Sequence, residues 1–171
     1  PSETPADHAD RIARIRTRIA AGDTYQVNHT LRLRARFAGD AWALFLALAT
    51  AQPTRTAAWV RLDGHTLCSA SPELFFRRDG DRVVCRPMKG TAPRGDTPAE
   101  DRVARAALRR SPKDRAENVM ITDMVRNDLG RIARPGTARV PRLFETEPYP
   151  TVWQMTSTVE ARTDAGLADL F

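Results

Sequence analysis

The segment 85–95 contains Lys89, one of only two lysines among the 27 lysine and arginine residues of the chain. A lysine amine that has lost its proton is a nucleophile, whereas an arginine guanidinium effectively never loses its proton. Gly90 and Thr91 follow directly, and glycine lets the backbone approach a ligand closely. These residues predict a site in which Lys89 attacks a bound small molecule. The alternative is a solvent-exposed lysine in a loop that follows a strand.

Glu73 is a second candidate for chemistry, because it follows Pro72 at the expected start of a strand. A carboxyl group in such a fixed place could act as a general acid. The alternative is an exposed glutamate at the entry to a strand.

Two carboxylates share a stripe with apolar side chains in the segment 112–129, which is predicted to be a helix. The stripe has helical spacing and consists of Glu117, Ile121, Met124 and Asp128. Inward-facing carboxylates are costly unless they are paired or bind a metal, and Mg²⁺ prefers carboxylates and water. Glu117 and Asp128 are therefore candidates for Mg²⁺ ligation or for buried pairing, and for Glu117 we do not favour an ion-pair network. For the acidic and polar residues nearer the helix end we favour an ion-pair network of Asp123, Arg126, Asp128 and Arg131, with Asn127 beside it.

The elements that must position these residues follow from periodicity and turn chemistry. Apolar spacing and capping residues predict helices over 7–21, 40–50, 97–110 and 112–129, the second of them buried. Alternation and the turns Asp63-Gly64 and Asp79-Gly80 predict strands over 24–36, 57–63, 66–70, 73–79, 82–87, 137–147 and 151–162. Lys89 is then expected in a loop after the strand 82–87. Strands broken by helices at irregular intervals predict an α+β fold, and 164–171 reads as the start of a helix in a fragment.

Composition excludes several classes of function. The chain has 171 residues, 42% hydrophobic and 28% charged, as expected for a soluble globular domain. Its net charge of +6 could attract nucleic acid or an anionic small substrate, but scattered arginines without interleaved aromatic residues argue against nucleic acid. With no apolar run of membrane length and no leader pattern, we expect no membrane partner and a cytoplasmic location.

Metal and thiol chemistry also have weak sequence signals. Cys68 and Cys85 have no ligand spacing and are expected to be reduced thiols. The three histidines, His8, His29 and His65, lie far apart and share no ligand spacing either.

Five motifs together resemble the chorismate-utilising enzymes, in the order and spacing of that family. They are the segments 22–28, 69–73, 86–91, 114–118 and 123–128. The resemblance implies an α+β fold in which antiparallel, sandwich-like sheets are flanked by helices. It also implies that residues 1–171 form the N-terminal two-thirds of a catalytic domain, and that this segment alone is inactive.

Lys89 narrows the resemblance within the family. The run Pro87-Met-Lys-Gly-Thr resembles the aminodeoxychorismate synthase branch, whereas anthranilate synthases resemble Pro-Ile-Ala-Gly-Thr. Members that add water to chorismate carry a lysine where this chain has Gln26, so the resemblance to those members is weaker. The implied reaction is amination of chorismate at C4 to 4-amino-4-deoxychorismate, for 4-aminobenzoate and folate synthesis. The implied ammonia source is a glutamine amidotransferase subunit or fused domain.

The resemblance also implies roles for individual residues. Lys89 attacks chorismate, and Glu73 protonates the departing hydroxyl. The substrate contacts are Gly90, Thr91 and Gln154, and the Mg²⁺ ligand is Glu117. Gln154 stands where family members carry a histidine, so it can hydrogen-bond the substrate but cannot exchange protons. Two alternatives remain open: an anthranilate synthase in which Lys89 is incidental, and a non-catalytic chorismate-binding remnant.

Overall fold

The computed structural model describes residues 1–171 and divides them into two compact units, 1–39 and 40–171. In the first unit, α1 (Pro5–Ala21) begins with a reciprocal capping box between Thr4 and Asp7 and ends at the left-handed Gly22. This confirms the predicted helix, although it starts at Pro5, two residues before the predicted start.

The predicted strand over 24–36 is wrong, because these residues have no regular secondary structure. Alternating side chains describe a strand only where a neighbouring strand takes up its backbone hydrogen bonds. The first unit has no other strand, so the alternation is left without a ladder.

The second unit begins with a helix and a hairpin. Asp40 caps α2 (Ala41–Ala51), and the turn at Gly64 joins β1 (Ala58–Leu62) to β2 (His65–Ser69). The rings of Trp42 and Trp59 meet in a T-shaped arrangement, with their centroids 5.4 Å apart. The prediction that this helix is buried is wrong, since none of its residues is. The side chains of α2 itself are apolar on every side of the helix, and the element that α2 contacts most is β2.

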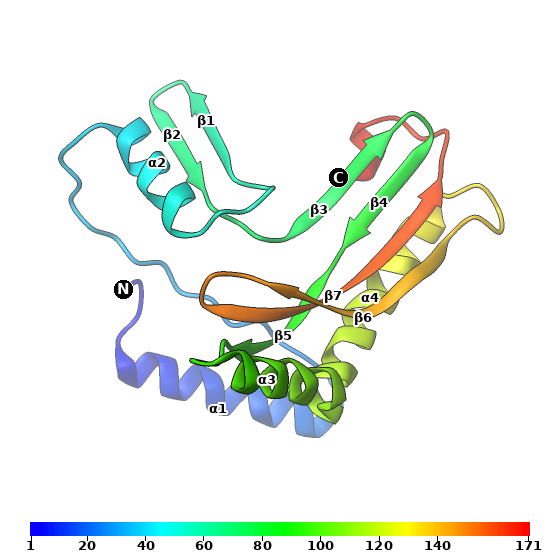
Figure 1. Cartoon of the computed structure of the whole chain (residues 1–171), viewed down its shortest axis with the longest axis horizontal. Helices are drawn as coiled ribbons and strands as arrows, with labels where there is room; N and C mark the ends of the chain where they lie inside the picture. Colours follow the sequence, from blue (N-terminus) through cyan, green and yellow to red (C-terminus); the bar gives the residue numbers. More distant parts are fainter. The chain divides into compact units, whose positions relative to one another are not determined.

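The main sheet is antiparallel throughout, with the long strand β7 in its middle (Figure 1). β7 pairs with β6 along one edge and with β4 and then β5 along the other, and β3 lies beyond β4. The strands are β3 (Leu74–Asp79), β4 (Arg82–Arg86), β5 (Met88–Pro93), β6 (Arg139–Pro148) and β7 (Val152–Arg162). The prediction that Lys89 lies in a loop is therefore wrong: β5 is a strand because the free edge of β7 takes up its backbone.

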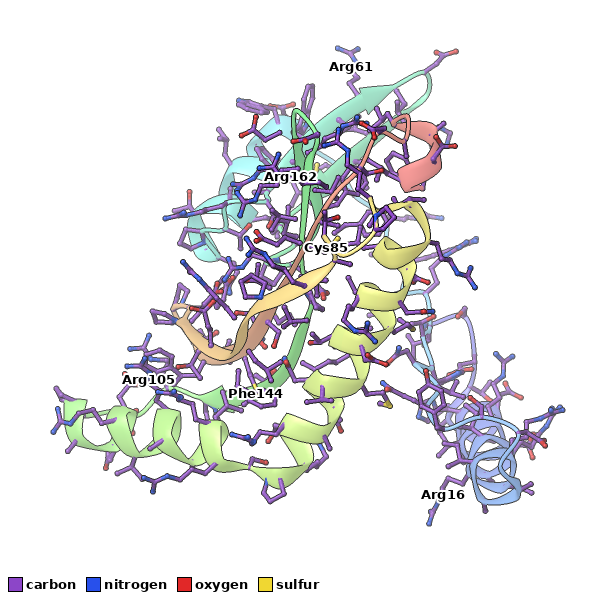
Figure 2. All side chains as sticks on the ribbon, turned by 90° about the vertical axis from the view of Figure 1, so that its right-hand side faces the viewer. Arg16, Arg61, Cys85, Arg105, Phe144 and Arg162 are labelled. Carbon is purple, nitrogen blue, oxygen red and sulfur yellow. The ribbon has the colours of Figure 1, made fainter.

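Two helices cover one face of this sheet. The capping box of Thr97 and Glu100 starts α3 (Pro98–Arg110), and Ser111 caps α4 (Pro112–Ile132), so both predicted helices are confirmed. Val83, Cys85, Val159 and Ala161 of the sheet pack against Leu129 of α4. Cys85 lies in the middle of this layer (Figure 2), and burial raises the pKa of its thiol to about 11.

The other face of the sheet is polar and open. It contributes to a groove of about 850 Å³, whose lining includes Arg82, Arg86, Glu147 and Glu160. The fold is thus the predicted α+β arrangement of helices and antiparallel sheet. The expected terminal helix within 164–171 is a single 3₁₀ turn, Ala168–Leu170. No helix in the chain is both long and apolar enough to cross a bilayer.

Candidate active site

Lys89 and Gly90 form a bulge in β5. Met88 lies opposite Thr156 and Thr91 lies opposite Gln154, so Lys89 and Gly90 are fitted against a single residue of β7. Gly90 has φ +101°, and a Cβ there would lie 3.0 Å from the Cβ of Asp114. Only glycine takes up this conformation without strain, so the glycine fixes where the half-buried Lys89 leaves the strand.

Asn118 of α4 holds the bulge from the helix side. Its Nδ2 donates to the carbonyl oxygens of Lys89 and Met155, each at 3.2 Å, and its Oδ1 accepts from Ser157 Oγ. Its side chain is fully buried, so these bonds replace contacts with water that it cannot make. Sequence reasoning included Asn118 in a motif but gave it no role. The available signal was an amide on what is now seen to be the inward stripe of the helix.

Glu73 is held against β5 next to the bulge. The backbone N–H of Met88 donates to Glu73 Oε1 at 2.9 Å, and Glu73 N–H donates to Ser71 Oγ at 3.3 Å. The Glu73 side chain is otherwise exposed. The structure thus brings the candidate acid to the residue that precedes the candidate nucleophile.

Thr91 and Gln154 meet across neighbouring strands. Thr91 Oγ1 donates to Gln154 Oε1 at 2.9 Å, which leaves the Gln154 amide NH₂ available as a donor. Because side chains alternate along a strand, Gln154 lies on the same open face as Thr156. Two of the three predicted substrate contacts therefore form one polar pair beside the bulge.

Glu117 is only half-buried, and it pairs with Lys113 at 3.1 Å one turn earlier. Its hydrogen bond with Lys113 raises the pKa of that ammonium. Glu117 follows Asp114, the residue packed on Gly90, by three positions, so it lies on the same side of α4 as the bulge. Mg²⁺ takes one or two protein carboxylates and keeps several waters. An accessible carboxylate whose lysine partner is exposed to solvent fits one such ligand position.

The predicted inward stripe of α4 is wrong by one residue. The buried positions are Asn118, Thr122 and Leu129, whereas Asp128 is exposed. Of the expected ion-pair network only Asp123 and Arg126 pair, at 2.6 Å. Carboxylates at a buried face would need partners, and the sheet opposite offers backbone carbonyls, which suit an amide donor instead.

Asp101 of α3 anchors the far end of β5, a role that the sequence did not reveal. It accepts from Arg94 through two bonds of 2.7 Å, and from Trp153 Nε1 and Gly95 N–H. The hydrogen bonds from Arg94 hold the pKa of this carboxyl well below its usual range. The strand that carries Lys89 is thus fixed at the bulge and at its end.

The groove on the open face is not itself the candidate site. None of Glu73, Lys89, Gly90, Thr91, Glu117 and Gln154 lines it, although Met88 beside the bulge does. Its charges are partly paired, Arg86 with Glu147 and Arg82 with Glu160.

Comparison with known proteins places these motifs in context. The family model described as chorismate binding enzyme matches residues 1–171. Aminodeoxychorismate synthase component 1 of Klebsiella aerogenes is 45% identical over 167 residues, covering 96% of this chain and 37% of that protein. An anthranilate synthase component 1 of Haloarcula marismortui is 40% identical over 159 residues, covering 93% of this chain and 32% of that protein. The chain thus spans roughly a third of these relatives.

A solved structure shares the fold. The crystal structure of anthranilate synthase component I from Streptococcus pneumoniae matches with a TM-score of 0.69 at 24% identity. The match covers 80% of this chain and 30% of that one. It supports the arrangement of sheet and helices described above.

Proposed function

Because the chain belongs to the chorismate-binding enzyme family, we propose that its site serves the amination of chorismate at C4, giving 4-amino-4-deoxychorismate. The observation that carries the proposal is the placement of Lys89 on a glycine-fixed bulge, with the Glu73 carboxylate bound to the preceding residue. A nucleophile and an acid on adjacent positions suit a substitution that needs both. The 45% identity to an aminodeoxychorismate synthase component supports this branch.

Lys89 would act as the nucleophile in the first step. Its neutral amine forms a bond to ring carbon C2, two ring double bonds shift, and the C4–O bond breaks. Glu73 gives a proton to the departing oxygen, which leaves as water, and the new C–N linkage loses a proton.

Ammonia would complete the exchange. It forms a bond to C4, the double bonds shift back, and the C2–N bond to Lys89 breaks. One proton passes from the new ammonium to the departing nitrogen, which gives the amine product and restores the neutral amine of Lys89. A glutamine amidotransferase, as subunit or fused domain, would supply the ammonia for 4-aminobenzoate and folate synthesis.

The remaining residues would bind and orient the substrate. Gly90 lets the strand approach the ring closely, and the polar pair of Thr91 and Gln154 offers a hydroxyl and an amide to its oxygens. Glu117 would be one ligand of Mg²⁺, which when bound supplies positive charge opposite a substrate carboxylate.

The test is to incubate the full-length gene product with chorismate, Mg²⁺ and ammonium, and to identify the product by mass and ultraviolet spectrum. We expect 4-amino-4-deoxychorismate, which keeps the enolpyruvyl group. Without ammonium, intact-mass analysis should find chorismate less water on Lys89. The chain offers a matched control, because Lys113 is the other lysine. Lys89→Ala should lower kcat by more than about a thousandfold and abolish the adduct, whereas Lys113→Ala should keep it.

A second candidate is anthranilate synthase, because a protein of that name is 40% identical. Its product would be anthranilate with release of pyruvate, and Lys89→Ala would then have little effect. That result would overturn the proposed role of Lys89. Mg²⁺-dependent binding of chorismate without turnover would instead favour a non-catalytic remnant.

A further inference from the structure

Three metal-ligating side chains meet in the unit 1–39. Glu3 Oε1 lies 2.9 Å from His8 Nδ1 and 2.9 Å from His29 Nε2. Glu3 directly precedes the N-cap of α1 and His8 lies in the first turn of that helix, whereas His29 comes from the extended segment that runs back past the N-terminus (Figure 1). His8 and His29 share no ligand spacing in the sequence, and they meet because the chain reverses after Gly22.

The carboxylate of this cluster is buried but only partly satisfied. The Glu3 side chain is 3% exposed, yet its Oε2 has no hydrogen-bond partner, and Arg11 approaches that oxygen only as an ion pair at 3.3 Å. His29 is largely buried and His8 is half-exposed, which leaves one side open to solvent.

We propose that Glu3, His8 and His29 form a binding site for a divalent transition-metal ion of the zinc type. Two imidazoles and one carboxylate are a ligand set that such ions favour, with a fourth position left to water. The three ligand atoms already lie within 4.8 Å of one another. A bound ion would replace the hydrogen-bond protons between the carboxylate and the rings, while Arg11 stays on the other carboxylate oxygen.

The scarcity of buried side chains in this unit indicates how a bound ion could stabilise it. Glu3 is the only buried residue among 1–39, and no apolar side chain there is buried. A metal, a disulfide or a partner can hold a segment that has no apolar core of its own. Arg32 N–H also donates to Ser2 Oγ at 2.9 Å, so the N-terminal residues and the returning segment meet at two points. A metal would join the helix start to that segment, independently of the chemistry proposed at Lys89.

The first test is titration of the intact chain, freed of metal by a chelator, with Co²⁺ followed by Zn²⁺. We expect one equivalent of Co²⁺ to give the visible absorption of a low-coordinate site, and Zn²⁺ to remove it. In proton NMR spectra, bound Co²⁺ should shift the ring signals of His8 and His29 and leave those of His65 in place. Binding should weaken as the pH falls, because protons compete with a metal ion for its ligand atoms.

Variants make the assignment specific. Glu3→Gln and His29→Ala should each weaken Co²⁺ binding by more than about tenfold. His65→Ala is the matched control, because His65 lies in the exposed β1–β2 turn region, and it should bind as the unchanged chain does. The NMR measurement needs no variant, so misfolding of Glu3→Gln cannot obscure the answer. Absence of stoichiometric binding, or equal loss in His65→Ala, would show the cluster to be an ion-pair network only and overturn the proposal.

Discussion

The two faces of the central sheet are held by different forces. Toward the helices, β7 presents Met155, Ser157 and Val159, all fully buried. Toward the groove, β7 presents Thr156 and Glu160, which are also buried. Glu160 pairs with Arg82 and Arg139, whose side chains stay 49% and 72% exposed. One face excludes water with apolar contacts and a satisfied amide. The other covers its polar atoms with charged side chains whose ends remain in water.

The difference matters because the bulge at Lys89 has contacts on both faces of the sheet. Asn118 fixes its carbonyl from the helix side, and the pair of Thr91 and Gln154 lies on the open side. The position of Lys89 therefore depends on the buried face of the sheet, whereas contact with a ligand depends on the exposed face. Changes on the helix side should cost stability and activity together, and changes on the open side should separate them.

Asn118→Ala should have the largest effect on folding. It removes the side-chain donor to the carbonyls of Lys89 and Met155, and it removes the acceptor of the Ser157 hydroxyl, which keeps only the bond that it accepts from Phe144 N–H. Unsatisfied buried polar groups cost about 1–3 kcal/mol each, so we expect the free energy of unfolding to fall by about 3 kcal/mol. Urea denaturation followed by circular dichroism measures this change.

The control is Asn127→Ala, on the exposed side of the same helix. It should change the free energy of unfolding by less than about 0.5 kcal/mol. Equal losses in the two variants would mean that helix propensity, and not the buried network, determines the result.

Gly90→Ala should rank second. The new methyl group would force an alanine to φ +101° and bring its Cβ to 3.0 Å from Asp114. Strained backbone of this kind costs about 1–3 kcal/mol, and we expect a loss near 2 kcal/mol with a displaced Lys89. Gly80→Ala tests the strain alone, because φ there is +58° and nothing lies within 4 Å. If Gly80→Ala destabilised the chain as much, the close approach to α4 would be unimportant.

Local signals predicted much of the fold. The capping residues at Thr97 and Ser111 and the turns at Gly64 and Gly80 gave element boundaries within a few residues, because those interactions are made by neighbours in the sequence. They also placed Glu73 at a strand entry. These features need no knowledge of the rest of the chain.

The errors arose where a distant partner decides the outcome. β5 is a strand only because β7 offers an edge, and 24–36 is not one because its unit has no strand to pair with. The buried stripe of α4 follows Asn118 and Leu129 because the sheet opposite needs an amide donor there. The meeting of His8 and His29 depends in the same way on a chain reversal that periodicity does not encode.

Glu160→Gln sharpens the comparison from the open face. Glu160 accepts hydrogen bonds from Arg82 and Arg139, and the bond from Arg82 is the first cause of its lowered pKa. A carboxyl whose pKa is lowered in the folded state stabilises the fold above its unfolded pKa of about 4.3, and this contribution is lost as pH falls through the folded value. We expect a cost of about 1 kcal/mol at pH 7, because both arginines keep contact with water.

The difference in the free energy of unfolding between the unchanged chain and Glu160→Gln should stay constant above about pH 5 and shrink below about pH 4. Urea denaturation midpoints measured across this pH range would record it. Added salt should reduce it. Asp123→Asn is the control, since its pair with Arg126 is exposed on the helix surface. A cost for Glu160→Gln as large as that for Asn118→Ala would contradict the proposed difference between the faces.

Thr91→Val should have the smallest effect on stability and still impair binding. Thr91 is exposed, its bond to Gln154 competes with water, and valine keeps the β-branched shape that suits a strand. We expect the free energy of unfolding to change by less than about 0.5 kcal/mol, while KM for chorismate in the full-length gene product rises several-fold at nearly unchanged kcat. Thr66→Val, at an exposed position in β2, should alter neither quantity. An unchanged KM for Thr91→Val would remove the open face from the substrate site and leave the bulge to bind chorismate from the helix side alone.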